Sequence, residues 1–220
     1  MKNESKEFAY ILLEKIGRAK HVVEVGAYKP EHLICLPLIF DTNCRVQLIE
    51  PNPKGIKELR KYFSNFSNIE IYECAVSDTK EKLTLIVPDI TKNNPDAEAS
   101  AFLGQQDSSP YRSREAHGQV EKLTPIVVAA ETWDNFDDGT IDGLVVDTEG
   151  SEWTVIKQLK SRPKVICIEM EGPCGYKNPN YNKIISWMND NDYDLYRIEK
   201  VRCLEGEVPT DYIYIRNDLK

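Results

Sequence analysis

Acidic side chains recur where apolar, strand-like runs of this sequence come to an end. Glu24 lies in HVVEVGA, Glu50 closes RVQLIE, and Asp147 follows LVV in LVVDTEG. Glu169 and Glu171 occupy a similar place in VICIEMEG. Neighbouring parallel strands end at the same edge of a sheet, and ligands of open α/β sheets bind beyond that edge. The spacing therefore predicts a site in which several carboxylates converge.

The first of these motifs indicates the kind of ligand. Gly26 follows the strand-like run and has no Cβ, so a ligand can approach the backbone there. A dinucleotide site would place G-x-G-x-x-G in this turn, but Pro30 stands where a further glycine would be needed. The turn favours a ligand without a diphosphate, although an ordinary strand-to-helix turn explains the same residues.

Glu50 and the CAVSD segment add features of an adenosyl site. Glu50 lies 24 residues after Gly26, where a carboxylate can accept hydrogen bonds from both hydroxyls of a ribose. Ala75 and Val76 form a small apolar corner after the third strand that suits the face of an adenine. For Glu50, a solvated acid at a strand end is the alternative.

The later acids offer a different chemistry. Asp147 and Glu149 surround the end of one strand, and Glu169 and Glu171 the end of the next. Clustered carboxylates either share a proton or bind a hard divalent cation such as Mg²⁺ or Mn²⁺. Asp147, Glu169 and Glu171 are the predicted metal ligands. Separate salt bridges or helix caps are the alternative.

Strand-like and helix-like segments alternate along the chain, which predicts an α/β fold with a parallel sheet covered on both faces. The pattern predicts helices over residues 8–16, 31–40 (with Pro37 as a kink), 54–63, 151–159 (with Ser151 as N-cap) and 181–189. It predicts strands over residues 21–25, 45–50, 69–76, 83–87, 144–147, 165–170, 193–198 and 212–216, the last pair forming an antiparallel edge.

Residues 89–119 break this alternation. They are polar, carry several turn residues, and lack a regular period. A loop of this length in a compact domain is usually functional or disordered, so we predict a substrate lid or a solvated insertion here. The rest indicates a single domain over residues 1–220. His117 lies in the predicted lid.

Four segments together resemble the ordered signature of FkbM-type methyltransferases, which belong to the class I S-adenosylmethionine-dependent group. These segments are Glu24-Val25-Gly26-Ala27, Ile49-Glu50-Pro51-Asn52-Pro53, Ala75-Val76-Ser77-Asp78 and Val146-Asp147-Thr148-Glu149-Gly150-Ser151-Glu152. The resemblance covers roughly residues 20–172. Two positions depart from it: Glu24 stands where Asp is commoner, and Pro30 where the family often has glycine.

The resemblance implies a Rossmann-like sheet of seven strands, with an antiparallel last strand and helices on both faces. It places the methionine part of the cofactor at Glu24, Gly26, Ala27 and Tyr28, in the crevice that Asp147 also faces. It assigns binding of the ribose to Glu50, Pro51 and Asn52, and binding of the adenine to Ala75 and Val76. It also implies O-methylation of sugars and related hydroxylated natural products.

A sugar hydroxyl is a weak acid, so its methylation needs a base or a metal. Asp147 is the leading candidate for the base, and Glu149 and His117 are further candidates. The acceptor is expected to be a glycan, a deoxysugar or another small hydroxylated metabolite. A nicotinamide oxidoreductase and a non-catalytic binding module on the same fold are the rival interpretations.

The composition limits the classes of partner that the protein is expected to bind. The 220 residues carry 28 basic and 36 acidic side chains, a net charge of −8, which argues against nucleic acid as a partner. No apolar run is long enough to span a membrane. Six cysteines without a C-x-x-C pair predict buried, reduced thiols and a cytoplasmic location. The oligomeric state stays open, a homodimer included.

Overall fold

A seven-stranded sheet forms the centre of the computed structural model, which describes residues 7–89, 97–104, 123–203 and 206–219, without the side chains of residues 7, 174 and 203. Its strands are β1 (His21–Val25), β2 (Arg45–Ile49), β3 (Ile69–Tyr72), β9 (Gly143–Val146), β10 (Val165–Glu169), β13 (Tyr193–Cys203) and β14 (Gly206–Arg216). They lie in the order β13-β14-β10-β9-β1-β2-β3. Strands β3, β2, β1, β9 and β10 run parallel, and β14 runs antiparallel to β10 and β13. The Rossmann-like sheet with an antiparallel last strand is confirmed.

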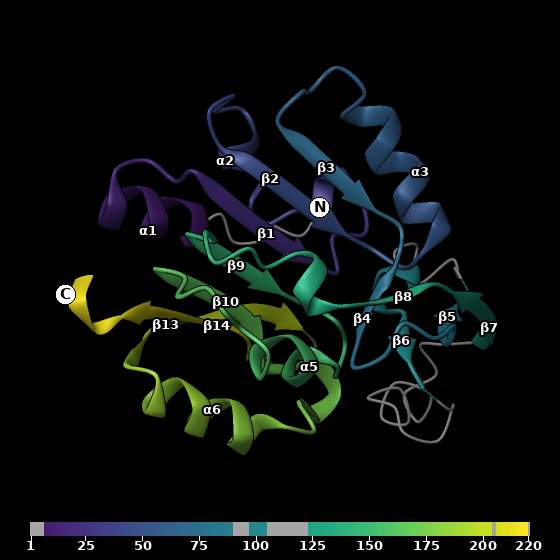
Figure 1. The fold of residues 1–220 in the computed structure, drawn as a ribbon. Coiled ribbons are helices and arrows are strands. Elements are labelled where there is room, and N and C mark those ends of the chain that lie inside the picture. Colours follow the sequence, from purple (N-terminus) through teal and green to yellow (C-terminus); the bar gives the residue numbers. More distant parts are fainter. Residues whose placement is uncertain (1–6, 90–96, 105–122, 204–205, 220) are drawn as a thin grey trace.

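Helices cover both faces of this sheet. They are α1 (Glu7–Ile16), α2 (Leu36–Ile39), α3 (Pro53–Tyr62), α5 (Glu152–Ile156) and α6 (Tyr181–Asp190), with 3₁₀ turns η1 (Pro30–His32), η4 (Trp133–Asn135), η5 (Pro173–Gly175) and η6 (Asn217–Leu219). One buried cluster joins α1, α2 and α3 to one face, and a second joins α5, α6 and η4 to the other (Figure 1). Neighbouring strand residues divide between the two clusters, as Val22 and Val23 do, because strand side chains alternate between faces.

Three predicted elements differ from the structure. The helix predicted over residues 31–40 is only η1 and the single turn α2, since Pro37 removes a backbone donor and stops propagation. The helix predicted over residues 151–159 ends at Ile156. The final strands are longer than predicted, and β14 lies inside the sheet, with β13 at its edge.

The strand predicted over residues 69–76 is two strands in different sheets. It breaks after Tyr72, and β4 (Ala75–Ser77) pairs in parallel with β8 (Ala130–Thr132). The predicted strand at 83–87 is β5 (Leu83–Pro88), which pairs with β6 (Phe102–Leu103) and β7 (Leu123–Val128). Figure 1 shows these small sheets beyond the arrowheads of β2 and β3, where the parallel strands end.

The predicted lid is partly regular. Within its described residues lie the 3₁₀ turn η2 (Ala97–Ser100) and the strand β6. Tertiary packing against β5 orders these residues, although their sequence shows no period. His117 lies outside the described residues.

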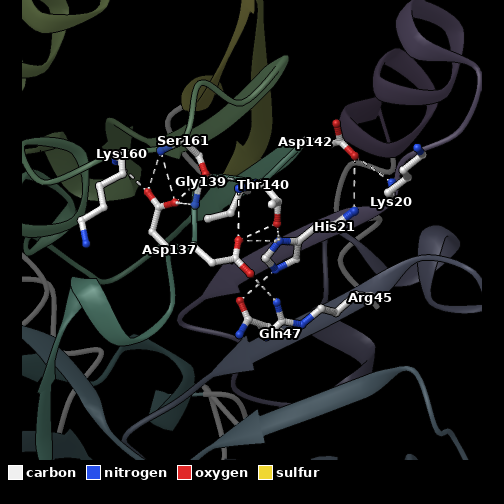
Figure 2. Close-up of polar contacts among 12 residues, drawn as sticks. Lys20, His21, Arg45, Gln47, Asp137, Gly139, Thr140, Asp142, Lys160 and Ser161 are labelled. Atoms are coloured by element: carbon white, nitrogen blue, oxygen red, sulfur yellow. Dashed lines mark hydrogen bonds and ion pairs between the residues drawn. The ribbon is translucent and has the colours of Figure 1, made fainter.

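The opposite edge of the sheet, where the parallel strands begin, is held by a polar network (Figure 2). His21 Nδ1 lies 2.8 Å from Thr140 Oγ1, and its Nε2 lies 2.9 Å from the side-chain amide of Gln47. The Asp142 carboxylate accepts from the backbone N–H of Lys20 at 2.8 Å. These contacts tie the start of β1 to β2 and to the segment that leads into β9, so this edge serves stability.

The buried-thiol prediction is confirmed for the cysteines whose side chains the structure describes. Cys35, Cys44, Cys74 and Cys167 are buried and free. Within the described ranges, no helix combines the length and the apolarity needed to cross a bilayer.

Gly26 marks the closest approach between two strand ends. Its φ is +90°, and a Cβ built there would overlap the carbonyl oxygen of Asp147. The position therefore requires glycine on two grounds, backbone conformation and space.

Gly26→Ala tests this close approach, and Gly139→Ala is its matched control. Gly139 has a φ of +87° and open space around its Cβ position, so both variants carry the conformational cost of about 1–2 kcal/mol. We expect Gly26→Ala to lose at least about 2 kcal/mol more, the scale of a backbone shift forced by overpacking. Urea unfolding measures both, and equal losses would show that the strand ends are not in contact.

Candidate active site

A pocket opens at the carboxyl ends of β1, β2 and β9. It contains about 550 Å³ of empty space, including its open mouth. Its walls include the predicted residues Gly26, Glu50, Pro51, Ala75, Val76, Asp147 and Glu149. The structure thus brings half of the sequence-predicted site residues into one cavity, beside a wall formed by β5, β6 and η2.

Glu50 lines the pocket and organises the turn beside it. Its side chain is buried and accepts hydrogen bonds from the backbone N–H of Tyr28 at 2.9 Å and of Asn52 at 2.6 Å. Burial raises the pKa of Glu50 to about 7, although the two N–H groups act in the opposite direction. The alternative of a solvated acid at a strand end does not hold.

Glu24 serves the loop after β1 and is absent from the pocket wall. Its buried carboxylate accepts from the backbone N–H of Ile34 at 3.0 Å and of Cys35 at 2.8 Å. Ala27 packs in the cluster under α1, α2 and α3. Neither residue lines the pocket, so the structure supports only a role for them in shaping this loop. Their contact with the cofactor stays a prediction.

Tyr28 and Asn52 flank Glu50. Tyr28 is buried, has a φ of +43°, and lies 5.4 Å from the His32 ring. Asn52 caps α3 by accepting from the N–H of Lys54 at 3.1 Å, while its buried Nδ2 has no partner. Both residues fix the first turn of α3 against the pocket.

The sequence did not identify the residues of β5, β6 and η2 that line the pocket. Leu85 and Leu103 come from β5 and β6, and Glu98 comes from η2. Glu98 is buried and pairs with Lys54 Nζ, and the Tyr28 hydroxyl donates to it at 3.5 Å. Leu85 lies in the strand predicted over residues 83–87, whereas Glu98 and Leu103 lie in residues 89–119, which lack a regular period, so no local signal linked these residues to the site.

Glu152 shapes the loop after β9. Its fully buried carboxylate accepts from the N–H groups of Thr148 at 2.9 Å and Gly150 at 3.0 Å, and from the Asn178 side chain. The predicted N-cap Ser151 occupies the cap position, but its side chain makes no cap hydrogen bond. Glu149, in the same loop, adopts a φ of +53°. The loop is directed toward the end of the neighbouring strand β10.

Three carboxylates meet at this point. Ligand oxygens of Asp147, Glu149 and Glu169 all lie within 4.8 Å of one another. Burial and the neighbouring carboxylates raise the pKa of both Asp147 and Glu169 well above the usual range. Glu171 is not in this group, and its role as a metal ligand stays a prediction. The chain leaves β10 after Glu169, and Glu171 begins the hairpin of β11 (Glu171–Gly172) and β12 (Tyr176–Lys177).

The group of acids formed by Asp147, Glu149 and Glu169 makes the free energy of unfolding depend on pH. Asp147 and Glu169 have pKa values near 4 in an unfolded chain, so above about pH 4 the folded protein keeps protons that the unfolded chain loses. The free energy of unfolding then falls by about 1.4 kcal/mol per pH unit for each retained proton, until the pH passes the folded pKa.

Asp147→Asn removes one of these carboxyls, so we expect a shallower loss of stability between pH 5 and pH 7. Urea unfolding in EDTA measures it. Glu171→Gln is the control and should keep the wild-type slope. A wild-type slope in Asp147→Asn would contradict the shared burial of the acids.

Comparisons with known proteins agree with this architecture. The family model described as "Methyltransferase FkbM domain" matches residues 24–195. A search of the curated proteins found no significant match. Among solved structures, cofactor-bound Rv0187 from MTB is 11% identical, covering 97% of this chain and 80% of that one, with a TM-score of 0.50.

Two further solved structures are similar at lower scores. One is the 1,6-didemethyltoxoflavin-N1-methyltransferase of Burkholderia thailandensis with bound S-adenosylhomocysteine, at 10% identity, 97% and 79% coverage and a TM-score of 0.49. The other is Aeropyrum pernix fibrillarin with bound S-adenosyl-L-methionine, at 10% identity, 90% and 67% coverage and a TM-score of 0.48. Since the family match spans most of the sequence, this chain belongs to the methyltransferase FkbM domain family.

Proposed function

We propose that this S-adenosylmethionine-dependent methyltransferase methylates a hydroxyl group of a sugar, in a glycan or a deoxysugar. The observation that carries the proposal is one pocket with Glu50 on one wall, a small apolar corner beside it, and the acid group of Asp147 on the opposite wall. Family membership supports the methyl transfer. Many hydrogen-bonding carboxylates at the site favour a polyhydroxylated acceptor.

The pocket residues fit the cofactor. Gly26 lines the pocket at the end of β1, and the buried Glu50 carboxylate can accept from ribose hydroxyls. Cys74, Ala75, Val76, Leu85 and Leu103 offer an apolar lining for the adenine. The carboxylates of Asp147 and Glu149 complement a positively charged ligand, and the Oε2 atom of Glu149 is buried without a partner.

The chain's part in the reaction is to place a hydroxyl and take its proton. When bound, S-adenosylmethionine supplies a methyl group on a positively charged sulfur that is already a good leaving group. Asp147 lies at the end of β9 in the pocket wall, so its carboxylate can accept the proton of an acceptor hydroxyl. Burial, and next the charge of Glu149, raise the pKa of Asp147 and so its basicity, although its hydrogen bond with Glu169 acts in the opposite direction.

Another small hydroxylated metabolite is the alternative acceptor, and a panel of deoxysugars, glycans and phenolic or hydroxy-acid metabolites decides between them. A non-catalytic module would bind the cofactor but transfer no methyl group to any of these. The free, buried cysteines support the predicted cytoplasmic setting.

Glu50→Gln tests the ribose assignment. We expect its affinity for S-adenosylhomocysteine to fall by about 1.5–3 kcal/mol, the scale of a lost charged hydrogen-bond acceptor. Titration calorimetry measures it. Glu70→Gln, whose carboxylate pairs with Arg45 away from the pocket, should bind as the wild type does. Wild-type affinity in a folded Glu50→Gln protein would remove Glu50 from the ribose.

Asp147→Asn tests the base. We expect turnover to fall by a factor of about 10²–10⁴, as for a lost general base, with a much smaller change in affinity for S-adenosylhomocysteine. Single-turnover methyl transfer and calorimetry separate the two effects. Near-normal turnover would move the proton transfer to another residue, with His117 the next candidate.

A further inference from the structure

We propose that Asp147, Glu149 and Glu169 form a binding site for one divalent cation, Mg²⁺ or Mn²⁺. The cation would polarise the acceptor hydroxyl, and only this role rests on the proposed function. The site itself rests on the arrangement of side chains, and it can be tested without turnover.

The geometry suits a small hard cation. The three residues each offer a carboxylate oxygen, and these oxygens all lie within 4.8 Å of one another. In an octahedral Mg²⁺ site, neighbouring oxygen ligands lie about 3 Å apart and opposite ones about 4.2 Å apart. Cation binding would therefore draw the three oxygens closer together, and the remaining positions would be left for water and the acceptor.

The charges around the group are unbalanced. Among the described residues, no lysine, arginine or histidine forms a salt bridge with Asp147, Glu149 or Glu169. Glu169 is 9% exposed, and one oxygen each of Glu149 and Glu169 is buried without a hydrogen-bond partner. Buried carboxylates are normally paired or coordinate a metal.

Glu152 has a structural role, and its hydrogen bonding differs from that of the three proposed ligands. Both its oxygens are occupied, one by Thr148 and Gly150 and the other by Asn178. It shapes the loop and has no ligand capacity to spare. The three proposed ligands have that capacity.

Tyr176 provides the independent observation. This residue is 5% exposed, and its hydroxyl has no hydrogen-bond partner. The hydroxyl lies 3.8 Å from the position of a Cβ on Gly150. Burial raises its pKa, and the charges of Glu152, Glu169, Glu149 and Asp147 act in the same direction. A donor that faces these acids and bonds to none of them suits a hydrogen bond to a ligand of the ion, such as a coordinated water.

The cofactor is the competing source of positive charge. Asp147 and Glu149 also line the cofactor pocket, whereas Glu169 and Tyr176 do not. The cation therefore belongs on the side of Asp147 that faces β10. A metal and a cofactor that occupied the same space would compete, and those in adjacent spaces would bind together.

The experiment titrates Mn²⁺ into the full chain without cofactor and follows free Mn²⁺ by electron paramagnetic resonance. We expect one Mn²⁺ per chain, displaced by Mg²⁺ and retained when S-adenosylhomocysteine is added. Asp147→Asn, Glu149→Gln and Glu169→Gln should each weaken Mn²⁺ binding at least tenfold. Tyr176→Phe should weaken it a few-fold, while the matched control Glu171→Gln should bind as the wild type does.

Each outcome decides the proposal. Absence of stoichiometric binding, displacement by S-adenosylhomocysteine, or equal binding by the Asp147, Glu149 and Glu169 variants would overturn it. Glu149 lies on a half-buried loop, so its variant keeps the test valid if a buried variant does not fold. Methyl transfer to sugars in EDTA without Mn²⁺ binding would reject the metal site and keep the proposed function. Mn²⁺ binding without methyl transfer to any hydroxyl would keep the metal site and reject the proposed function.

Discussion

A buried carboxylate that accepts two or more backbone N–H groups recurs in each loop that builds the site. Glu24 holds the loop after β1, Glu50 joins that loop to the turn between β2 and α3, and Glu152 holds the loop after β9. Burying a charge is costly, and charge-assisted hydrogen bonds to backbone donors offset much of that cost. Each such acid fixes the backbone of the loop whose N–H groups it accepts.

The two edges of the sheet divide stability and chemistry between them. Where the parallel strands begin, Asp142, His21 and Gln47 find partners within the protein. Where they end, Gly26 permits the closest approach of two strands, and Asp147 and Glu149 face an open pocket. Unsatisfied polar atoms of Glu149, Glu169 and Asn52 lie on this second edge. The energetic cost of these atoms is expected at a site that binds something.

The small sheet of β5, β6 and β7 adds a wall that the central sheet lacks. Leu85 and Leu103 face the corner formed by Ala75, and Glu98 links η2 to Lys54 at the start of α3. The pocket is therefore enclosed by residues between 74 and 103, from the first part of the chain segment inserted between β3 and β9. Enclosure of this kind excludes water, which strengthens electrostatic interactions inside the site.

The sequence by itself determined the parallel core, its glycine turn and the acids at its strand ends. Apolar runs such as HVVEV and VICIE are long enough to identify buried strands, and parallel strands must present their ends together. Glu50 and Asp147 could therefore be placed in one site from their positions alone. The family resemblance rested on the same local motifs.

Only the tertiary structure decided which acids meet and what covers them. Glu169 and Glu171 are equivalent in sequence, yet the chain turns away between them, and Glu149 joins the group because Glu152 bends its loop. Tyr176 and Glu98 reach the site from a hairpin and a 3₁₀ turn that carry no periodic signal. Periodicity reports contacts within one element, whereas these side chains are positioned by packing between elements far apart in the chain.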